Sequence, residues 1–208
     1  MTNQNSELQR TEAFSDGVFA IAITLLALEL KTPMNGEEPL HHGLLNALAH
    51  QWPAYMSFMT SFLTVLVTWI NHHRMFEVIK KRDNTFQFLN GVLLMTITLL
   101  PFATVLVSEY ILQPDARIAV TVLNGIYLAM ALAFNAMWRY ASRSERLFTD
   151  ESDRNTAAHI TAQFRFGPAL YLANLLIGLI APLPSFIINF AFAAYYAIPP
   201  KERRGAEG

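Results

Sequence analysis

The sequence predicts an all-α, polytopic membrane protein with six transmembrane helices and both termini in the cytoplasm. Hydrophobic residues make up 53% of the 208 residues and charged residues only 15%, against about 25% charged residues in soluble domains. The charges collect in short stretches, and the apolar stretches between them approach the roughly 20 residues that a helix needs to cross a bilayer core. Lysine and arginine are concentrated on one side of the predicted membrane, which sets the orientation.

The predicted spans follow from the apolar stretches, and we place them at roughly 12–31, 51–74, 85–109, 116–139, 160–181 and 183–198. A possible short helix near 40–50 precedes the second span. We expect Pro101 to kink the third span, because proline removes a backbone hydrogen bond and clashes with the preceding turn. Only 181–184 separate the last two spans, so we expect a tight helical hairpin. The sixth span is short, about 24 Å.

The third and fourth spans argue against a soluble helical bundle, which is the alternative for a chain of this size. The stretches 87–108 and 118–138 carry no charged residue on any face, whereas helices of soluble bundles keep a polar face toward water. The length favours one compact unit, a single transmembrane domain over 1–208.

Basic residues set the expected orientation. With the N-terminus inside, the outer side of the membrane receives only Lys31 and Arg117 of the 15 lysine and arginine residues. The other 13 fall inside: Arg10, Arg74, Lys80, Lys81, Arg82, Arg139, Arg143, Arg146, Arg154, Arg165, Lys201, Arg203 and Arg204. Cytoplasmic loops are enriched in these residues, and an even number of spans returns the C-terminus to the same side.

The first span has two different faces. Taking about 100° per residue, Gly17, Thr24, Leu25 and Leu28 fall within about 60° of Ile21 and form an aliphatic stripe with one hydroxyl. Asp16 points about 140° away from this stripe. An ionisable group inside a span is unfavourable by roughly 2.5–3.5 kcal/mol at the helix centre and by less near its end. Asp16 is therefore expected to face protein or water.

A polar cluster at the end of the second span is the expected partner of Asp16. This cluster contains Trp69, His72 and His73. It lies at the same inner boundary as Asp16, so we expect Asp16 and Ser15 to hydrogen-bond to it, with Arg10 closing the network from below. We interpret the network as a fastener that sets the angle of the first helix, because buried polar groups are mostly satisfied structural ones. The alternative is that Asp16 accepts a proton.

The same residues carry a family resemblance. Arg10, Phe14, Ser15 and Asp16 follow the pattern Arg-x-x-x-Phe-Ser-Asp, which resembles the signature of the endosomal/lysosomal potassium channel family. The Trp-x-x-His-His-Arg ending at 69–74, the number of spans and the orientation are also similar to that family. The likeness covers most of the chain and indicates a bacterial six-helix member.

The resemblance implies a homotetramer in which the first helix of each subunit lines the pore. It also implies that rings of bulky aliphatic residues and a nearby threonine select potassium. Counted from Phe14, the ring positions become Ile21, Leu25 and Leu28, and the threonine becomes Thr24. The stripe obtained from helical geometry contains the same four residues, although aliphatic residues at this spacing usually just face lipid or neighbouring helices.

The expected function is therefore potassium conduction through a hydrophobic constriction, which gates by expelling water. The expected partners are further copies of the chain, the lipid bilayer and K⁺ as the permeant ion, with no cofactor. The net charge of −1 gives no reason to expect nucleic acid. We expect a multi-pass protein of the cell inner (plasma) membrane.

Two other functions compete with potassium conduction. A secondary transporter or proton-coupled carrier would have an inverted repeat and helices broken at mid-membrane, but nothing similar to residues 14–16 recurs in the second half. An enzyme would need convergent ionisable residues at one depth, for which Asp16 with His72 and His73 is the only candidate set. No motif of a known catalytic site is present. We therefore expect no catalytic residues. The chain has no cysteine, and its histidines lack a metal-ligand spacing, so no metal site is expected either.

Overall fold

The computed structural model of the chain describes residues 2–32, 43–79, 82–143 and 166–197, and these are helical apart from short connections. The helices are α1 (Thr2–Leu28), α2 (Leu44–His50), α3 (Trp52–Val78), α4 (Asn84–Thr98), α5 (Leu100–Tyr110), α6 (Ala116–Arg143), α8 (Gly167–Ile180) and α9 (Pro182–Ala197). The expected short helix near 40–50 corresponds to α2; residues 40–42 lie outside the described ranges.

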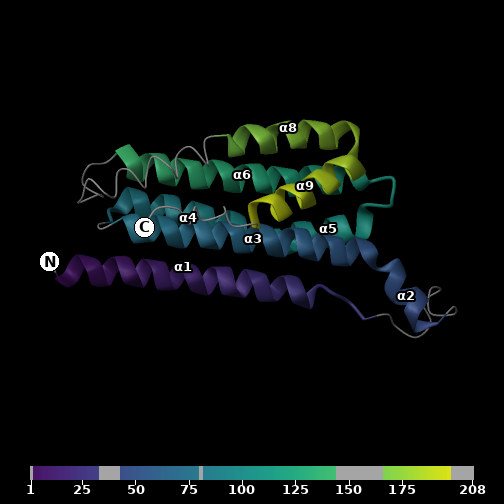
Figure 1. Cartoon of the computed structure of the whole chain (residues 1–208), viewed down its shortest axis with the longest axis horizontal. Helices are drawn as coiled ribbons and strands as arrows, with labels where there is room; N and C mark the ends of the chain where they lie inside the picture. The colour runs from purple at the N-terminus through teal and green to yellow at the C-terminus, as the bar shows by residue number, and fades with distance from the viewer. Residues whose placement is uncertain (1, 33–42, 80–81, 144–165, 198–208) are drawn as a thin grey trace, which may run out of the picture.

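The helices form an elongated bundle in which successive spans run in opposite directions (Figure 1). α1 lies along one edge and packs on α3, α4 and α5, while α8 lies along the opposite edge and packs on α6 and α9. Large side chains from α3 to α6 fill the interior between these edges, among them Met75, Phe86, Leu93 and Trp138. The edge position of α1 leaves one side of that helix without a neighbour.

Four helical segments are long and apolar enough to cross a membrane: Ser6–Leu28, Trp52–Val78, Asn84–Tyr110 and Ala116–Arg143. Apart from the seven-residue α2, two helices remain, and both are shorter. α8 has 14 residues and α9 has 16, which gives lengths of about 21 and 24 Å, below the roughly 30 Å of a bilayer core. Residues 160–165 of the expected fifth span lie outside the described ranges. The all-helical, multi-pass prediction is confirmed, with four clear spans and two shorter apolar helices in the described residues.

The expected kink in the third span is present as a break at Leu99 between α4 and α5, and Pro101 is the second residue of α5. Proline has no N–H to donate to the preceding turn. The backbone tightens just before it, with Leu99 N–H donating to the Thr96 carbonyl over 3.3 Å.

The α8–α9 hairpin is tied to α6 by buried amides. Asn174 donates to Asn189 Oδ1 over 2.8 Å, and Asn189 donates to Asn124 Oδ1 over 2.7 Å. Gly178 lies against this network, because a Cβ there would be 2.7 Å from Asn124 Nδ2. Only Ala181 separates α8 from α9, so the prediction of a tight hairpin is confirmed.

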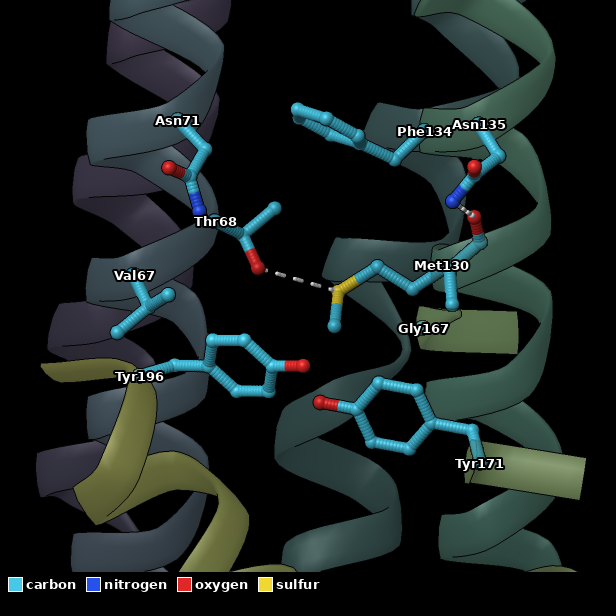
Figure 2. Close-up of a pocket in the computed structure, with 10 residues that line it drawn as sticks. Val67, Thr68, Asn71, Met130, Phe134, Asn135, Gly167, Tyr171 and Tyr196 are labelled. Carbon is cyan, nitrogen blue, oxygen red and sulfur yellow. Dashed lines mark hydrogen bonds between the residues drawn. The ribbon is translucent and has the colours of Figure 1, made fainter. Parts of the chain in front are cut away.

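A small cavity of about 80 Å³ lies between α3, α6, α8 and α9 (Figure 2). The hydroxyls of Tyr171 and Tyr196 point toward each other across it, and Thr68 donates to the sulfur of Met130 over 3.9 Å. This volume accommodates a few water molecules. Its lining contains no residue of α1 and no carboxylate.

Candidate functional site

The two faces of α1 have opposite surroundings. Phe19, Ala22 and Leu26 are no more than 1% exposed and pack into the bundle. Ile21 and Leu28 are 61% and 77% exposed on the other side. Buried and exposed residues recur along α1 with the helical period of 3.6 residues. One face of the helix therefore packs into the bundle, and the opposite face stays exposed.

The exposed face contains all four predicted pore residues. Leu25 is 41% exposed, and Thr24 is exposed between Ile21 and Leu25. Phe14, which is 67% exposed, extends the same face toward the N-terminus. The described part of the chain therefore brings these residues onto one uncovered surface, which lipid, a second copy of the chain or water could occupy.

Thr24 adds one polar group to this aliphatic face. Its hydroxyl donates to the Ile21 carbonyl over 2.9 Å. A hydroxyl has one proton to donate and two lone pairs to accept with. Since the proton is used within the helix, the oxygen of Thr24 can act only as an acceptor toward whatever lies outside.

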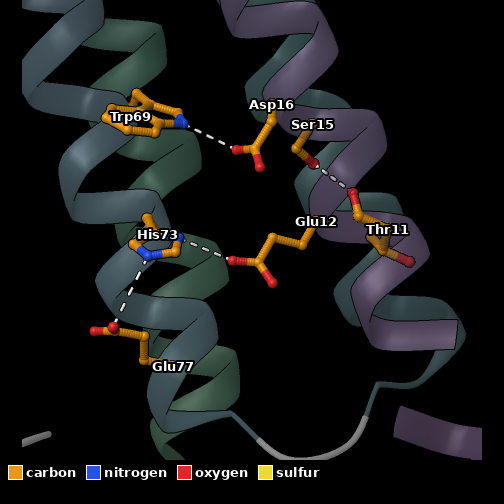
Figure 3. Close-up of polar contacts among 7 residues, drawn as sticks. All are labelled: Thr11, Glu12, Ser15, Asp16, Trp69, His73 and Glu77. Atoms are coloured by element: carbon orange, nitrogen blue, oxygen red, sulfur yellow. Dashed lines mark hydrogen bonds and ion pairs between the residues drawn. The ribbon is translucent and has the colours of Figure 1, made fainter. Parts of the chain in front are cut away.

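Asp16 faces α3, away from the aliphatic stripe, as its helical position predicts. The Trp69 indole N–H donates to Asp16 Oδ1 over 2.9 Å (Figure 3). Asp16 is only partly buried. A hydrogen bond to a charged acceptor contributes about 1.5–3 kcal/mol, so this bond is a substantial tie between α1 and α3.

Ser15 reaches the α3 cluster through a residue of α4 rather than directly. Asn90 Nδ2 donates to the Ser15 hydroxyl over 2.9 Å, and its Oδ1 lies 2.8 Å from His72 Nε2. The amide oxygen of Asn90 can only accept, so His72 carries its proton on Nε2 in this network. The chain His72–Asn90–Ser15 therefore joins α3, α4 and α1 in the buried interior.

His72 and His73 are adjacent but play different parts. His72 is fully buried, with its ring stacked on Phe76 at a centroid distance of 4.5 Å. His73 is exposed and lies 2.9 Å from Glu12 of α1 and 3.8 Å from Glu77 of its own helix (Figure 3). The Glu12 contact is a second tie between α1 and α3, one turn before Asp16.

The expected role of Arg10 is not seen in the described residues. Arg10 is exposed and makes no hydrogen bond or ion pair there with Ser15, Asp16 or the α3 cluster. Arg82 instead bridges the helix ends, with Nη2 lying 3.1 Å from Glu7 Oε2. A long arginine near a helix end is free to extend toward water, so the sequence pattern alone does not fix its partner.

Sequence reasoning did not assign Asn90 and Glu12 to the network. Glu12 lies four residues before Asp16 and so on the same side of α1, a spacing that could have identified it. Asn90 is an amide inside an otherwise apolar span, a position where side chains generally bond to another helix. Which helix it contacts depends on packing, and no sequence signal supplies that.

Comparison with known proteins extends these observations. The family model described as endosomal/lysosomal potassium channel TMEM175 matches residues 10–101. The potassium channel Cha6605_3372 of Chamaesiphon minutus is 45% identical over 94% of this chain and 96% of that protein. The potassium channel B446_29190 of Streptomyces collinus is 35% identical over 97% of this chain and 98% of that protein.

A solved structure agrees with the fold. The crystal structure of a lysosomal potassium-selective channel TMEM175 homolog from Chamaesiphon minutus superposes with a TM-score of 0.83 and 44% sequence identity. The match covers 92% of this chain and 97% of that one. The similarity therefore extends through the short α8 and α9 as well as the signature helix.

Proposed function

We propose, because this chain belongs to the endosomal/lysosomal potassium channel TMEM175 family, that it conducts K⁺ across a membrane along the exposed face of α1. The family is one of ion channels and not of enzymes. The observation that carries the proposed route is the uncovered stripe of Ile21, Thr24, Leu25 and Leu28 on a helix at the edge of the bundle.

The aliphatic residues of this stripe form the gate in the proposal. Copies of α1 around a common axis would stack Ile21, Leu25 and Leu28 as three successive collars. A narrow apolar collar expels water, and an ion does not enter a dry constriction. A small rotation of α1 or a change of side-chain rotamer would widen the collar and admit a partly hydrated ion.

Thr24 supplies the polar element of the constriction. The Thr24 hydroxyl already donates its hydrogen bond to the Ile21 carbonyl. A ring of these oxygens would therefore present lone pairs to a cation. Potassium loses hydration water at a lower free-energy cost than sodium. A pore that forces partial dehydration and returns only one hydroxyl ring therefore favours potassium.

In this proposal Asp16 and Trp69 fix the orientation of α1 about its own axis. Their hydrogen bond, together with the His73–Glu12 contact, fixes the N-terminal half of α1 against α3. The stripe is then aimed away from the protomer. The carboxylate acts as a fastener and not as a proton acceptor.

Assembly and topology complete the proposal. One protomer leaves the stripe open on one side, so a conduit needs further copies, and we propose a homotetramer. We further propose six spans, with the shorter α8 and α9 as the last two, in a single domain of the cell inner membrane. Arg10, Arg74, Arg82, Arg139 and Arg143 belong to helix segments that share one end of the bundle. Because lysine and arginine are enriched on the cytoplasmic side, this clustering supports cytoplasmic termini.

Potassium flux into proteoliposomes tests this function. A channel passes K⁺ down its gradient, follows the membrane potential and needs no second solute. A secondary transporter or proton-coupled carrier, the alternative function, would move K⁺ only together with another gradient. Abolition of K⁺ flux on collapse of a proton gradient, at a constant membrane potential, would contradict the channel.

A further inference from the structure

A groove of about 890 Å³ opens between α4, α6 and the start of α8, away from α1. Its walls are largely apolar and include Leu89, Leu132, Ala136 and Pro168. Leu132 is 52% exposed even though it lies in the middle of a membrane-spanning helix. The groove is separate from the stripe on α1 and takes no part in the proposed ion route.

Two arginines stand at one end of this groove. Arg139 and Arg143 are one turn apart on α6, both are exposed, and both line the groove. Within the described residues neither forms an ion pair. The nearby carboxylate of Asp83 caps α4 through Phe86 N–H and accepts the Tyr140 hydroxyl over 2.5 Å. That acidic group is thus engaged with protein donors, while the two guanidinium groups face the groove.

The residues of this groove lie at the membrane depths of a lipid headgroup and of its acyl chains. α6 has 28 residues and is about 42 Å long, so it exceeds the roughly 30 Å bilayer core. Its last turns, with Arg139 and Arg143, therefore reach the headgroup region. Leu132 is seven residues before Arg139, which places it about 10 Å deeper, among the acyl chains.

We propose that this groove binds an anionic phospholipid from the leaflet at the Arg143 end, with its phosphate at Arg139 and Arg143 and one acyl chain along Leu89, Leu132 and Ala136. Planar guanidinium groups bind phosphate oxygens in pairs, and two of them favour a headgroup with a net negative charge, because a zwitterionic headgroup carries its own cation beside the same phosphate. Basic pockets between membrane helices on the cytoplasmic side bind anionic headgroups. The apolar wall alone would accept any lipid, so the arginines supply the selectivity.

Native mass spectrometry of the purified full-length protein tests the proposal. Phosphatidylglycerol and phosphatidylcholine with identical acyl chains are added in turn, and the bound lipid is counted. We expect phosphatidylglycerol to bind about tenfold more tightly, and the Arg139→Gln/Arg143→Gln variant to lose that preference. Ala136→Trp, which fills the apolar wall without changing charge, should weaken the binding of both lipids.

The matched control is Arg74→Gln/Arg117→Gln, which removes the same charge from exposed sites on α3 and at the other end of α6. It should keep the preference for phosphatidylglycerol. Equal binding of the two lipids by the unmodified protein, or an equal loss in the control, would overturn the proposal. So would a change of oligomer mass in Ala136→Trp with unaltered lipid binding, because a second copy would then occupy the groove. The readout is lipid mass and does not depend on conduction.

Discussion

Asp16 and Thr24 lie two turns apart on one helix and face different surroundings. Asp16 accepts the Trp69 N–H of α3, whereas the exposed Thr24 hydroxyl is hydrogen-bonded within its own helix in the described residues. The first residue fixes α1 in the protomer. The second is exposed on the face that points away from the bundle. In the proposed function these two positions separate the structural role of the helix from its conducting role.

The first prediction concerns the fastener. Trp69→Phe keeps an aromatic ring but removes the indole N–H, which leaves the partly buried Asp16 carboxylate without that donor. The free energy of unfolding, measured by titration with SDS, should fall by about 1–3 kcal/mol. Trp52→Phe, at a position 40% exposed on the same helix, is the control and should change by no more than about 0.5 kcal/mol. Equal losses of unfolding free energy in Trp69→Phe and Trp52→Phe would show that the Trp69–Asp16 hydrogen bond does not fasten α1 to α3.

The second prediction concerns ion choice at Thr24. Thr24→Val keeps the shape and removes the oxygen, so the permeability ratio of K⁺ to Na⁺, taken from reversal potentials, should fall by about fivefold. That factor corresponds to about 1 kcal/mol of lost ion–oxygen interaction. Thr98→Val is the matched control, because Thr98 is also exposed and also donates to the carbonyl three residues earlier. An unchanged ratio in Thr24→Val would remove this residue from the selectivity mechanism.

At the scale of elements, the short α8 and α9 depend on α6 for their place. Neither is long enough to cross the bilayer core without local thinning of the bilayer or shielding by neighbouring helices. Their buried asparagines have partners on one another and on α6. Unsatisfied amides in an apolar interior would be unfavourable. The polar network therefore holds the hairpin in one register against α6.

The third prediction tests that packing. Gly178→Ala places a methyl group 2.7 Å from Asn124 Nδ2, so the amide must move and its hydrogen bonds weaken. We expect the free energy of unfolding to fall by about 1–3 kcal/mol. Gly125→Ala on α6 is the control, because a Cβ there meets nothing within 4 Å and alanine favours the helix by about 1 kcal/mol. A Gly178→Ala variant as stable as Gly125→Ala would contradict the close approach.

At the scale of the whole molecule, the bundle has two uncovered surfaces with different chemistry. α1 presents an aliphatic stripe with one hydroxyl, and the groove beside α6 presents an apolar wall ending in two arginines. α1 and α8 lie along opposite edges of the bundle (Figure 1), and the groove is lined by α4, α6 and α8 but by no described residue of α1. A central conduit on the first side leaves the second side facing lipid, so the two proposals are geometrically compatible.

Much of this arrangement could be predicted from the sequence. The charge-free stretches that end near Tyr110 and Arg139 specify long apolar helices, and Pro101 specifies where one of them breaks. The direction of Asp16 followed from helical geometry alone. Periodicity fixes which residues share a face, and that information is local.

What could not be predicted depends on contacts between helices. The described α8 is shorter than expected, because apolar composition does not state where a helix begins. Asn90 joins Ser15 to His72 only because α4 packs beside α1 and α3, and Arg10 remains outside the network for the same kind of reason. The exposed stripe on one protomer also does not show whether lipid, water or a second copy of the chain covers it.

The absence of cysteine from the chain allows a direct test of where the stripe lies. A single Leu28→Cys is treated with a charged, membrane-impermeant thiol reagent while the K⁺ current of the reconstituted protein is recorded. Ile118→Cys, at a position 64% exposed on α6, is treated identically. We expect the reagent to block the current of Leu28→Cys and to leave that of Ile118→Cys unchanged. A Leu28→Cys current that persists after complete modification, verified by mass, would contradict an ion route along α1.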